Sequence, residues 1–150
     1  MNYLKHFKRI TKHKWYVGKE CFKRKLYWQG LVHDLSKYSF TEFFTSAKYY
    51  KDGISPITVE RDEEGYSLAG IHHKSKNKHH YTYWIDRKYG EDFVAPMPEK
   101  YIQEMLCDFI GAGKAYNKDW TPEEPLKFYL NIKDTILLHK DTRKRFEELL

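Results

Sequence analysis

The chain has few cysteines, few prolines and no long apolar run. Its 150 residues include five prolines and two cysteines, Cys21 and Cys107. Two cysteines exclude a disulfide scaffold and a four-cysteine zinc site, but not a metal site built from other ligands. No apolar run reaches the ~18 residues that a membrane span needs, and Met1–His6 has no apolar signal core. We therefore expect a cytoplasmic protein without a membrane partner.

The composition is typical of a folded chain. Aromatic residues make up 17% of the sequence, which is too rich in Tyr, Phe and Trp for a disordered polymer. A chain of this length favours one hydrophobic core, so we expect a single domain over residues 1–150. The aromatic residues exceed what one small core needs, which indicates a protein partner or a homodimer.

Positive charge is concentrated at the N-terminus. Residues 1–28 hold nine Lys and Arg against one acid, a net charge of +8, whereas residues 29–150 hold eighteen against twenty, a net charge of −2. Aromatic residues such as Trp15 and Trp28 are interleaved with this charge. Such a face can bind nucleic acid or steer a phosphorylated small molecule, and it can equally be a solvated helix surface.

Hydrophobic spacing indicates an all-α protein. Ile10, His13, Val17 and Cys21 recur at helical intervals, which predicts a helix over about residues 3–27 with His13 on its inward face. Further helices are expected at 31–37 after Gly30, from the Ser-x-x-Glu capping box at 39–42, at 62–77, from Pro98 through 112, from 121 and from about 141.

The expected architecture is a compact bundle of about six to seven helices. The only β-like run is Ile57–Val59, which is too short to build a sheet and is expected to lie in a loop. Cys107 is expected to be a packing residue, and His6 and His139 lie outside any ligand pattern.

Ionisable residues lie on otherwise apolar helix faces. Asp108 interrupts an apolar stripe, and His33 and Asp34 lie together in the apolar segment Leu31–Leu35. Burying an unpaired acid is costly, and a metal ion is one natural partner for it. A His-Asp pair offers an imidazole nitrogen and a carboxylate oxygen to a divalent ion, although a buried His–Asp hydrogen bond is a common structural alternative.

The ordered set of these residues resembles a known family. His13, then His33-Asp34, then four histidines within nine residues, then Asp108 is similar to the HD-domain superfamily of metal-dependent phosphohydrolases, and Gly30–Lys37 is similar to its apolar-apolar-His-Asp-apolar-small-Lys signature. The chain also resembles a short bacterial and phage branch of that superfamily with no assigned activity. The four histidines of the cluster are His72, His73, His79 and His80.

The resemblance implies an all-helical fold and a metal site. His13, His33, Asp34 and Asp108 would bind one divalent metal ion, and the histidine cluster would supply the ligands of a second ion in a two-metal centre. Spacing alone does not decide which histidine of each pair, His72/His73 and His79/His80, points inward. Alternatively, the site holds one ion only, with one histidine of the cluster bound to the metal and another in contact with the substrate.

The chemistry of such a site is phosphoester hydrolysis. A divalent ion (Mn, Fe, Co, Ni, Zn or Mg) can activate a water and polarise a phosphoryl oxygen. Asp34 and Lys37 are the candidate catalytic residues, and we expect a nucleotide or another small phosphoester as the substrate. The candidate substrate-binding residues are Lys37, Lys76, Asn77, Tyr83 and Trp84.

Each substrate-binding residue has a structural alternative. Asn77 is equally suited to a helix C-cap in the left-handed conformation, and Tyr83 and Trp84 can pack in the core rather than stack on a base.

Two other functions compete with hydrolysis. They are a basic, aromatic nucleic-acid-binding module with structural histidines, and a di-iron oxygenase similar to some HD-type proteins.

Overall fold

The structure is a computed structural model that describes residues 2–150; Met1, the first residue of the expected domain, lies outside them. Its α-helices are α1 (Tyr3–Lys23), α2 (Tyr27–Val32), α3 (Phe40–Lys48), α4 (Pro56–Glu64), α5 (Leu68–Lys76), α6 (Glu99–Tyr116), α7 (Glu124–Ile132) and α8 (Lys140–Leu149). Two 3₁₀ helices and one antiparallel hairpin join them: η1 (Leu35–Tyr38), η2 (Tyr81–Trp84), β1 (Ile85–Lys88) and β2 (Glu91–Val94).

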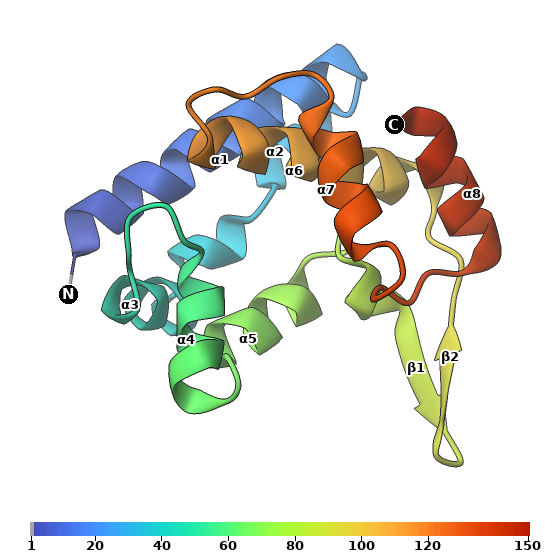
Figure 1. Cartoon of the computed structure of the whole chain (residues 1–150), viewed down its shortest axis with the longest axis horizontal. Coiled ribbons are helices and arrows are strands. Elements are labelled where there is room, and N and C mark those ends of the chain that lie inside the picture. Colours follow the sequence, from blue (N-terminus) through green and yellow to red (C-terminus); the bar gives the residue numbers. More distant parts are fainter. Residues whose placement is uncertain (1) are drawn as a thin grey trace.

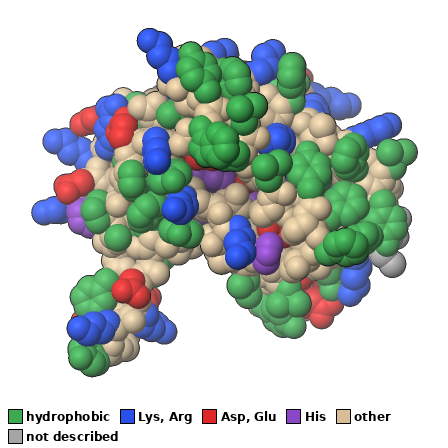
Figure 2. Space-filling view, turned by 180° about the vertical axis from the view of Figure 1, so that it is seen from behind, with side chains coloured by type: hydrophobic (Ala, Val, Ile, Leu, Met, Phe, Trp, Pro, Cys, Tyr) green, Lys and Arg blue, Asp and Glu red, His purple; other side chains and the backbone are tan. Residues whose placement is uncertain are grey.

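The helical class is therefore confirmed only approximately. The described residues form eight α-helices rather than six to seven, together with a two-stranded sheet that the sequence did not lead us to expect. The hairpin extends away from the helices (Figures 1 and 2). Its two-residue turn, Tyr89-Gly90, has positive φ at both positions, 53° and 85°, as a tight hairpin turn requires.

Two predictions for this region are wrong: the loop expected at Ile57–Val59 and the single helix expected at 62–77. Ile57–Val59 lies inside α4, which begins with Pro56 in the first turn. Gly65, with φ of 81°, ends α4. Ser67 then caps the start of α5, because its hydroxyl accepts from the Gly70 amide at 2.8 Å. The left-handed glycine followed by a new N-cap divides the expected helix into α4 and α5.

The segment around the His-Asp pair also differs from the prediction. Helix α1 ends at Lys23 rather than near residue 27, and Gly30 lies inside α2, packed so closely on α1 that a Cβ atom there would approach the Phe22 ring to 2.9 Å. Helix α2 ends at Val32, so the helix expected at 31–37 does not form. Asp34 takes a left-handed backbone conformation, φ 54° and ψ 26°, between α2 and η1.

The long helices α1 and α6 pack against each other at close range. A Cβ atom added to Gly111 of α6 would lie 2.3 Å from Cγ2 of Val17 on α1, so only glycine permits this approach. Val17, Cys21 and Cys107 are fully buried beside this crossing. The expectation that Cys107 is a packing residue is confirmed.

Helix α6 separates two interiors of different character. Its contacts with α7 and α8 enclose an apolar core, and on its other side α1, α3 and α5 surround buried histidines and acids (Figure 1). The buried apolar side chains are Met97, Ile102, Met105, Leu106, Tyr129, Ile136 and Phe146. Within residues 2–150, every helix is either too short or too polar to cross a membrane.

Candidate metal centre

Four residues from three segments converge between α1 and α6. His13 lies in the middle of α1, Asp108 in α6, and His33 and Asp34 at the break after α2. Nε2 of His13 lies 3.1 Å from Oδ2 of Asp34 and 3.1 Å from Oδ1 of Asp108. Nε2 of His33 lies 3.3 Å and 3.5 Å from the same two oxygens. One ligand atom from each of the four residues lies within 4.8 Å of every other, so the group can hold a metal ion.

A second group of ligands shares Asp34 with the first. Nε2 of His73, in α5, lies 3.4 Å from Oδ1 of Asp34, and Nε2 of His79, just after α5, lies 3.5 Å from the same oxygen. His80 completes this group. The Asp34 carboxylate therefore faces one group with Oδ2 and the other with Oδ1. This is the arrangement of a bridging ligand.

The second group contains buried polar atoms that make no hydrogen bond. Within the described residues, Oδ1 of Asp34, Nε2 of His79 and Nε2 of His80 are buried and make no hydrogen bond. Such atoms are rare and costly in folded proteins. Their convergence, and a donor set of one carboxylate and three imidazoles, fit a divalent transition metal or zinc ion.

The protonation states suit a cation site. Burial raises the pKa of Asp34, but His33, Lys37 and His73 outweigh this effect and hold it well below its usual value. Burial lowers the pKa of His73 and of His80, which keeps these imidazoles neutral and able to donate a lone pair at neutral pH. Burial lowers the pKa of His33, but the neighbouring carboxylates together raise it by more. The pKa of His33 is therefore above its usual value, as expected where the surroundings attract positive charge.

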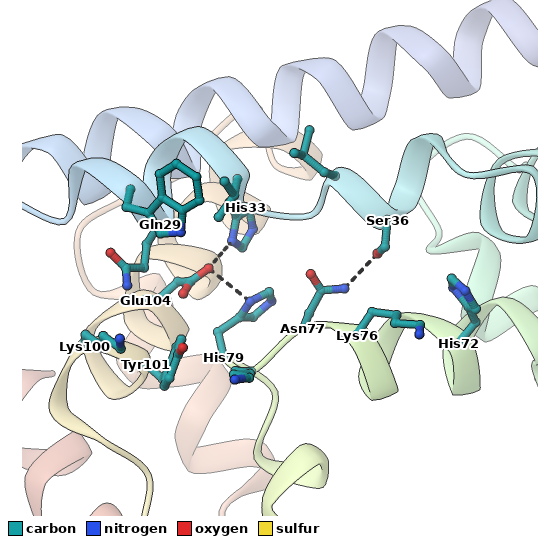
Figure 3. Close-up of a pocket in the computed structure, with 14 residues that line it drawn as sticks. Gln29, His33, Ser36, His72, Lys76, Asn77, His79, Lys100, Tyr101 and Glu104 are labelled. Atoms are coloured by element: carbon teal, nitrogen blue, oxygen red, sulfur yellow. Dashed lines mark hydrogen bonds and ion pairs between the residues drawn. The ribbon is translucent and has the colours of Figure 1, made fainter.

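Glu104 orients one histidine from each group. Its Oε1 lies 3.0 Å from Nδ1 of His33 and 3.3 Å from Nδ1 of His79 (Figure 3). With Nδ1–H donated to this carboxylate, each ring presents Nε2 to the metal site. Sequence analysis missed Glu104, although it lies one turn before Asp108 on the same helix.

Glu42 plays the same part for the α5 histidines. Its carboxylate accepts from Nδ1 of His73 at 2.9 Å and from Nδ1 of His72 at 2.7 Å. Ser39 does cap α3, as the sequence predicted, but Glu42 turns its side chain to the histidines rather than back to the cap. His72 belongs to neither ligand group, so His73 is the member of that pair brought to the centre.

Lys37 lies at the centre, whereas Lys76 and Asn77 do not. Nζ of Lys37 lies 2.5 Å from Oδ2 of Asp34, and although burial opposes it, the carboxylates of Asp34 and Asp108 raise the pKa of this lysine. Lys76 and Asn77 line a cavity of about 520 Å³ on the Glu104 side (Figure 3).

Asn77 has a structural role in the chain. Its amide donates to Oγ of Ser36 and to the His73 carbonyl, both at 2.8 Å. It caps α5 in an extended conformation, φ −116°, so the expected left-handed cap is wrong.

Tyr83 and Trp84 form part of the scaffold around η2. Nε1 of Trp84 donates to the Lys78 carbonyl at 2.8 Å, and the Trp84 ring packs on Tyr101 at 5.9 Å between ring centroids. The Tyr83 ring meets the Trp84 ring edge to face. Neither side chain lines any of the three cavities that reach the ligand groups.

Besides the cavity of about 520 Å³, which reaches His33 and His79, two further cavities open onto the ligand groups. The first, which we call the cationic cavity, has a volume of about 240 Å³ and includes His6, Arg9 and Lys37 with His13, His73, His80 and Asp108. The second, which we call the apolar cavity, has a volume of about 450 Å³ and reaches His79, His80 and Asp108.

His6 is a site residue that sequence analysis placed outside the pattern. Its side chain is buried, with 3% of the residue exposed, and neither ring nitrogen has a hydrogen-bond partner within residues 2–150. Burial, with the charges of Lys37 and Arg9, lowers its pKa to about 4. The other histidine set aside, His139, caps α8 by accepting from the Asp141 amide at 3.3 Å.

Comparison with known proteins gives a family of unknown function. A family model described as a family of unknown function, DUF5662, matches residues 2–150. No curated protein and no solved structure matches the chain. The function must therefore be argued from the site itself.

Proposed function

The chain belongs to the DUF5662 family, and we propose that it is a metal-dependent phosphohydrolase that cleaves a small phosphoester. The observation that carries this proposal is the shared Asp34 carboxylate, whose two oxygens face two separate ligand groups. Two cations held by one carboxylate would suit phosphoryl chemistry, because they would stabilise the negative charge that develops on the phosphoryl oxygens. The similarity of the ordered ligands to the HD-domain superfamily agrees with this proposal.

The first group would hold one divalent ion and the second group another. A bound ion would lower the pKa of a coordinated water and polarise a phosphoryl oxygen. In the reaction, one water adds to phosphorus, the bond to the ester oxygen breaks, and phosphate and an alcohol leave. Asp34 would orient both halves of the centre, since each of its oxygens belongs to a different half.

Lys37 and the carboxylates around it control charge. The protonated Lys37 amine lies beside Asp34 and lines the cationic cavity, where it would neutralise a non-bridging phosphoryl oxygen. Glu104 and Glu42 hold the rings of His33, His79 and His73. They reduce the reorganisation that substrate binding would otherwise require.

Elemental analysis and phosphate release test the proposal. Freshly purified protein should contain up to two divalent ions per chain and should release phosphate from esters in the presence of Mn²⁺, Co²⁺ or Ni²⁺. His33→Ala and Asp34→Ala should both lose metal and activity. Asp34→Ala should lose metal from both halves of the centre. His139→Ala is the matched control, because His139 caps α8 away from the centre.

Unchanged metal content in both His33→Ala and Asp34→Ala would contradict the proposal. Iron-dependent oxygen uptake without phosphate release would instead indicate that the protein is an oxygenase.

A further inference from the structure

A ridge on α6 separates the two cavities at the centre. Asp108, Ala112 and Tyr116 follow one another at intervals of four residues, so they share one face of the helix. These three side chains and His80 line both cavities. The middle residue of the ridge, Ala112, has only a methyl group as its side chain. A ligand at the centre can therefore extend past Ala112 from one cavity into the other.

The cationic cavity holds two fixed positive charges, Arg9 and Lys37, beside the carboxylates of Glu42 and Asp108. The Arg9 guanidinium donates to the carbonyls of Lys51 and Ile54, pairs with Asp52 at 3.2 Å, and lies 5.0 Å from the centroid of the Tyr116 ring. These contacts hold its charge beside the ridge. The protonated Lys37 lies at the same cavity, which suits this side to a phosphoryl group.

The apolar cavity offers a contrasting surface. Among the described residues, no Lys or Arg lines it, and away from the centre its walls are chiefly Met105, Phe109, Phe128 and Ile132. The Phe109 and Phe128 rings meet edge to face, with centroids 5.0 Å apart and planes at 79°. This side suits a compact apolar or flat aromatic group.

We infer that the substrate is a phosphomonoester whose alcohol carries such a group. The phosphate lies in the cationic cavity and at the ligand groups, and the apolar part crosses Ala112 into the cavity walled by Phe109 and Phe128. This inference rests on the proposed function, because it names the substrate of the same site. An aryl alcohol and a nucleoside both supply a flat group, and the test distinguishes them.

Phosphonates test the inference because they bind without being hydrolysed. Isothermal titration calorimetry in Mn²⁺ buffer would compare methylphosphonate, benzylphosphonate and the phosphonate analogue of AMP. Benzylphosphonate should bind at least tenfold more tightly than methylphosphonate, since burying a ring adds a favourable apolar contact. A gain for the AMP analogue equal to or larger than that for benzylphosphonate would identify the flat group as a nucleobase.

Variants of the ridge and the apolar wall localise the effect. Ala112→Leu should raise the ridge and remove most of the gain for benzylphosphonate over methylphosphonate. Phe128→Lys should also remove the gain. Leu130→Lys is the matched control, since Leu130 lies on the same helix, is as exposed as Phe128 at 51%, and does not line the cavity.

The outcomes separate the two proposals. Equal affinity for methyl- and benzylphosphonate, or a gain that survives both Ala112→Leu and Phe128→Lys, would overturn the inference even if phosphate release is observed. A gain that both variants remove, without phosphate release from any ester, would support the ligand class and contradict the hydrolase. Absence of binding by every phosphonate would overturn both.

Discussion

The interior between α6, α7 and α8 is apolar, whereas the interior between α6, α1, α3 and α5 is built largely from ionisable groups. Tyr129 and Phe146 fill the first, and His33, Asp34 and His79 are almost fully buried in the second. Apolar burial stabilises a fold without any ligand. Buried charges must instead be compensated by partners, so the stability of the ionic interior should depend on a bound cation.

Helix α6 belongs to both interiors. Met105 and Leu106 face the apolar core, and Glu104 and Asp108 face the ionic one. Side chains on α6 therefore offer a way to change one interior while leaving the other intact. The predictions below use this contrast.

The largest effect is expected in the apolar interior. Phe146 is completely buried, so Phe146→Ala should lower the free energy of unfolding by about 3–5 kcal/mol. The loss should be the same with Mn²⁺ and with a chelator, as measured by urea denaturation, and the metal content of the folded protein should not change. A loss that disappears on adding metal would mean that the two interiors are not independent.

Acid should weaken the ionic interior through His6. The pKa of His6 is about 4 in the fold against 6.5 in the unfolded chain, because burial and then Lys37 and Arg9 disfavour its charged form. The unfolded chain therefore binds this proton first as the pH falls. Stability is unaffected above pH 6.5 and declines between pH 6.5 and 4, by about 3 kcal/mol in total.

His6→Phe should reduce that decline, because the variant has no proton to bind at this position. Urea denaturation at pH 7 and at pH 4.5 would measure the difference, and the other titrating groups are common to both proteins. Parallel losses in wild type and variant would assign the acid sensitivity to other residues.

Removing the charge of Glu104 should weaken metal binding at both groups together. Glu104→Gln keeps the size of the side chain but not a carboxylate that accepts from both His33 and His79, so a 10- to 100-fold loss of Co²⁺ affinity is expected, about 1.4–2.7 kcal/mol. Chelator competition followed by the visible Co²⁺ spectrum would measure it.

Glu99→Gln is the matched control for that experiment. Glu99 lies on the same helix but pairs with Arg145 at the surface. Loss of only one ion in Glu104→Gln would contradict the idea that one carboxylate supports both groups.

The smallest effect is expected in the hairpin, which belongs to neither interior. Arg87 pairs with Asp92 at 2.8 Å on an exposed surface, so Arg87→Ala should change the free energy of unfolding by less than about 1 kcal/mol. Metal content should stay at the wild-type value. A large change in either measurement would connect the hairpin to the centre.

Local patterns predicted much of the helical scaffold. The inward face of α1 with His13, the capped start of α3 at Ser39 and the inward Asp108 all follow from helical periodicity and capping chemistry. The stripe of α1 also extends back to His6, seven residues before His13. The same periodicity could therefore have placed His6 on the buried face.

Contacts between distant segments could not be predicted in this way. Glu104 meets His33 across 71 positions and Glu42 meets His73 across 31, so no local spacing marks these carboxylates as partners. The left-handed conformation of Asp34 has no comparable local marker, whereas Gly65 and the Ser67 N-cap are local signals from which the break between α4 and α5 could have been predicted.

Gly111 sets the width of the metal site although it carries no functional group. Val17 lies four residues after His13 and Gly111 three residues after Asp108, so the contact between α1 and α6 lies one turn from both ligands. Any side chain at position 111 would push α1 and α6 apart. It would thereby increase the 3.1 Å distance between Nε2 of His13 and Oδ1 of Asp108. A position that contacts neither ligand thus controls the spacing between them, and with it the size of any ion that the proposed centre could hold.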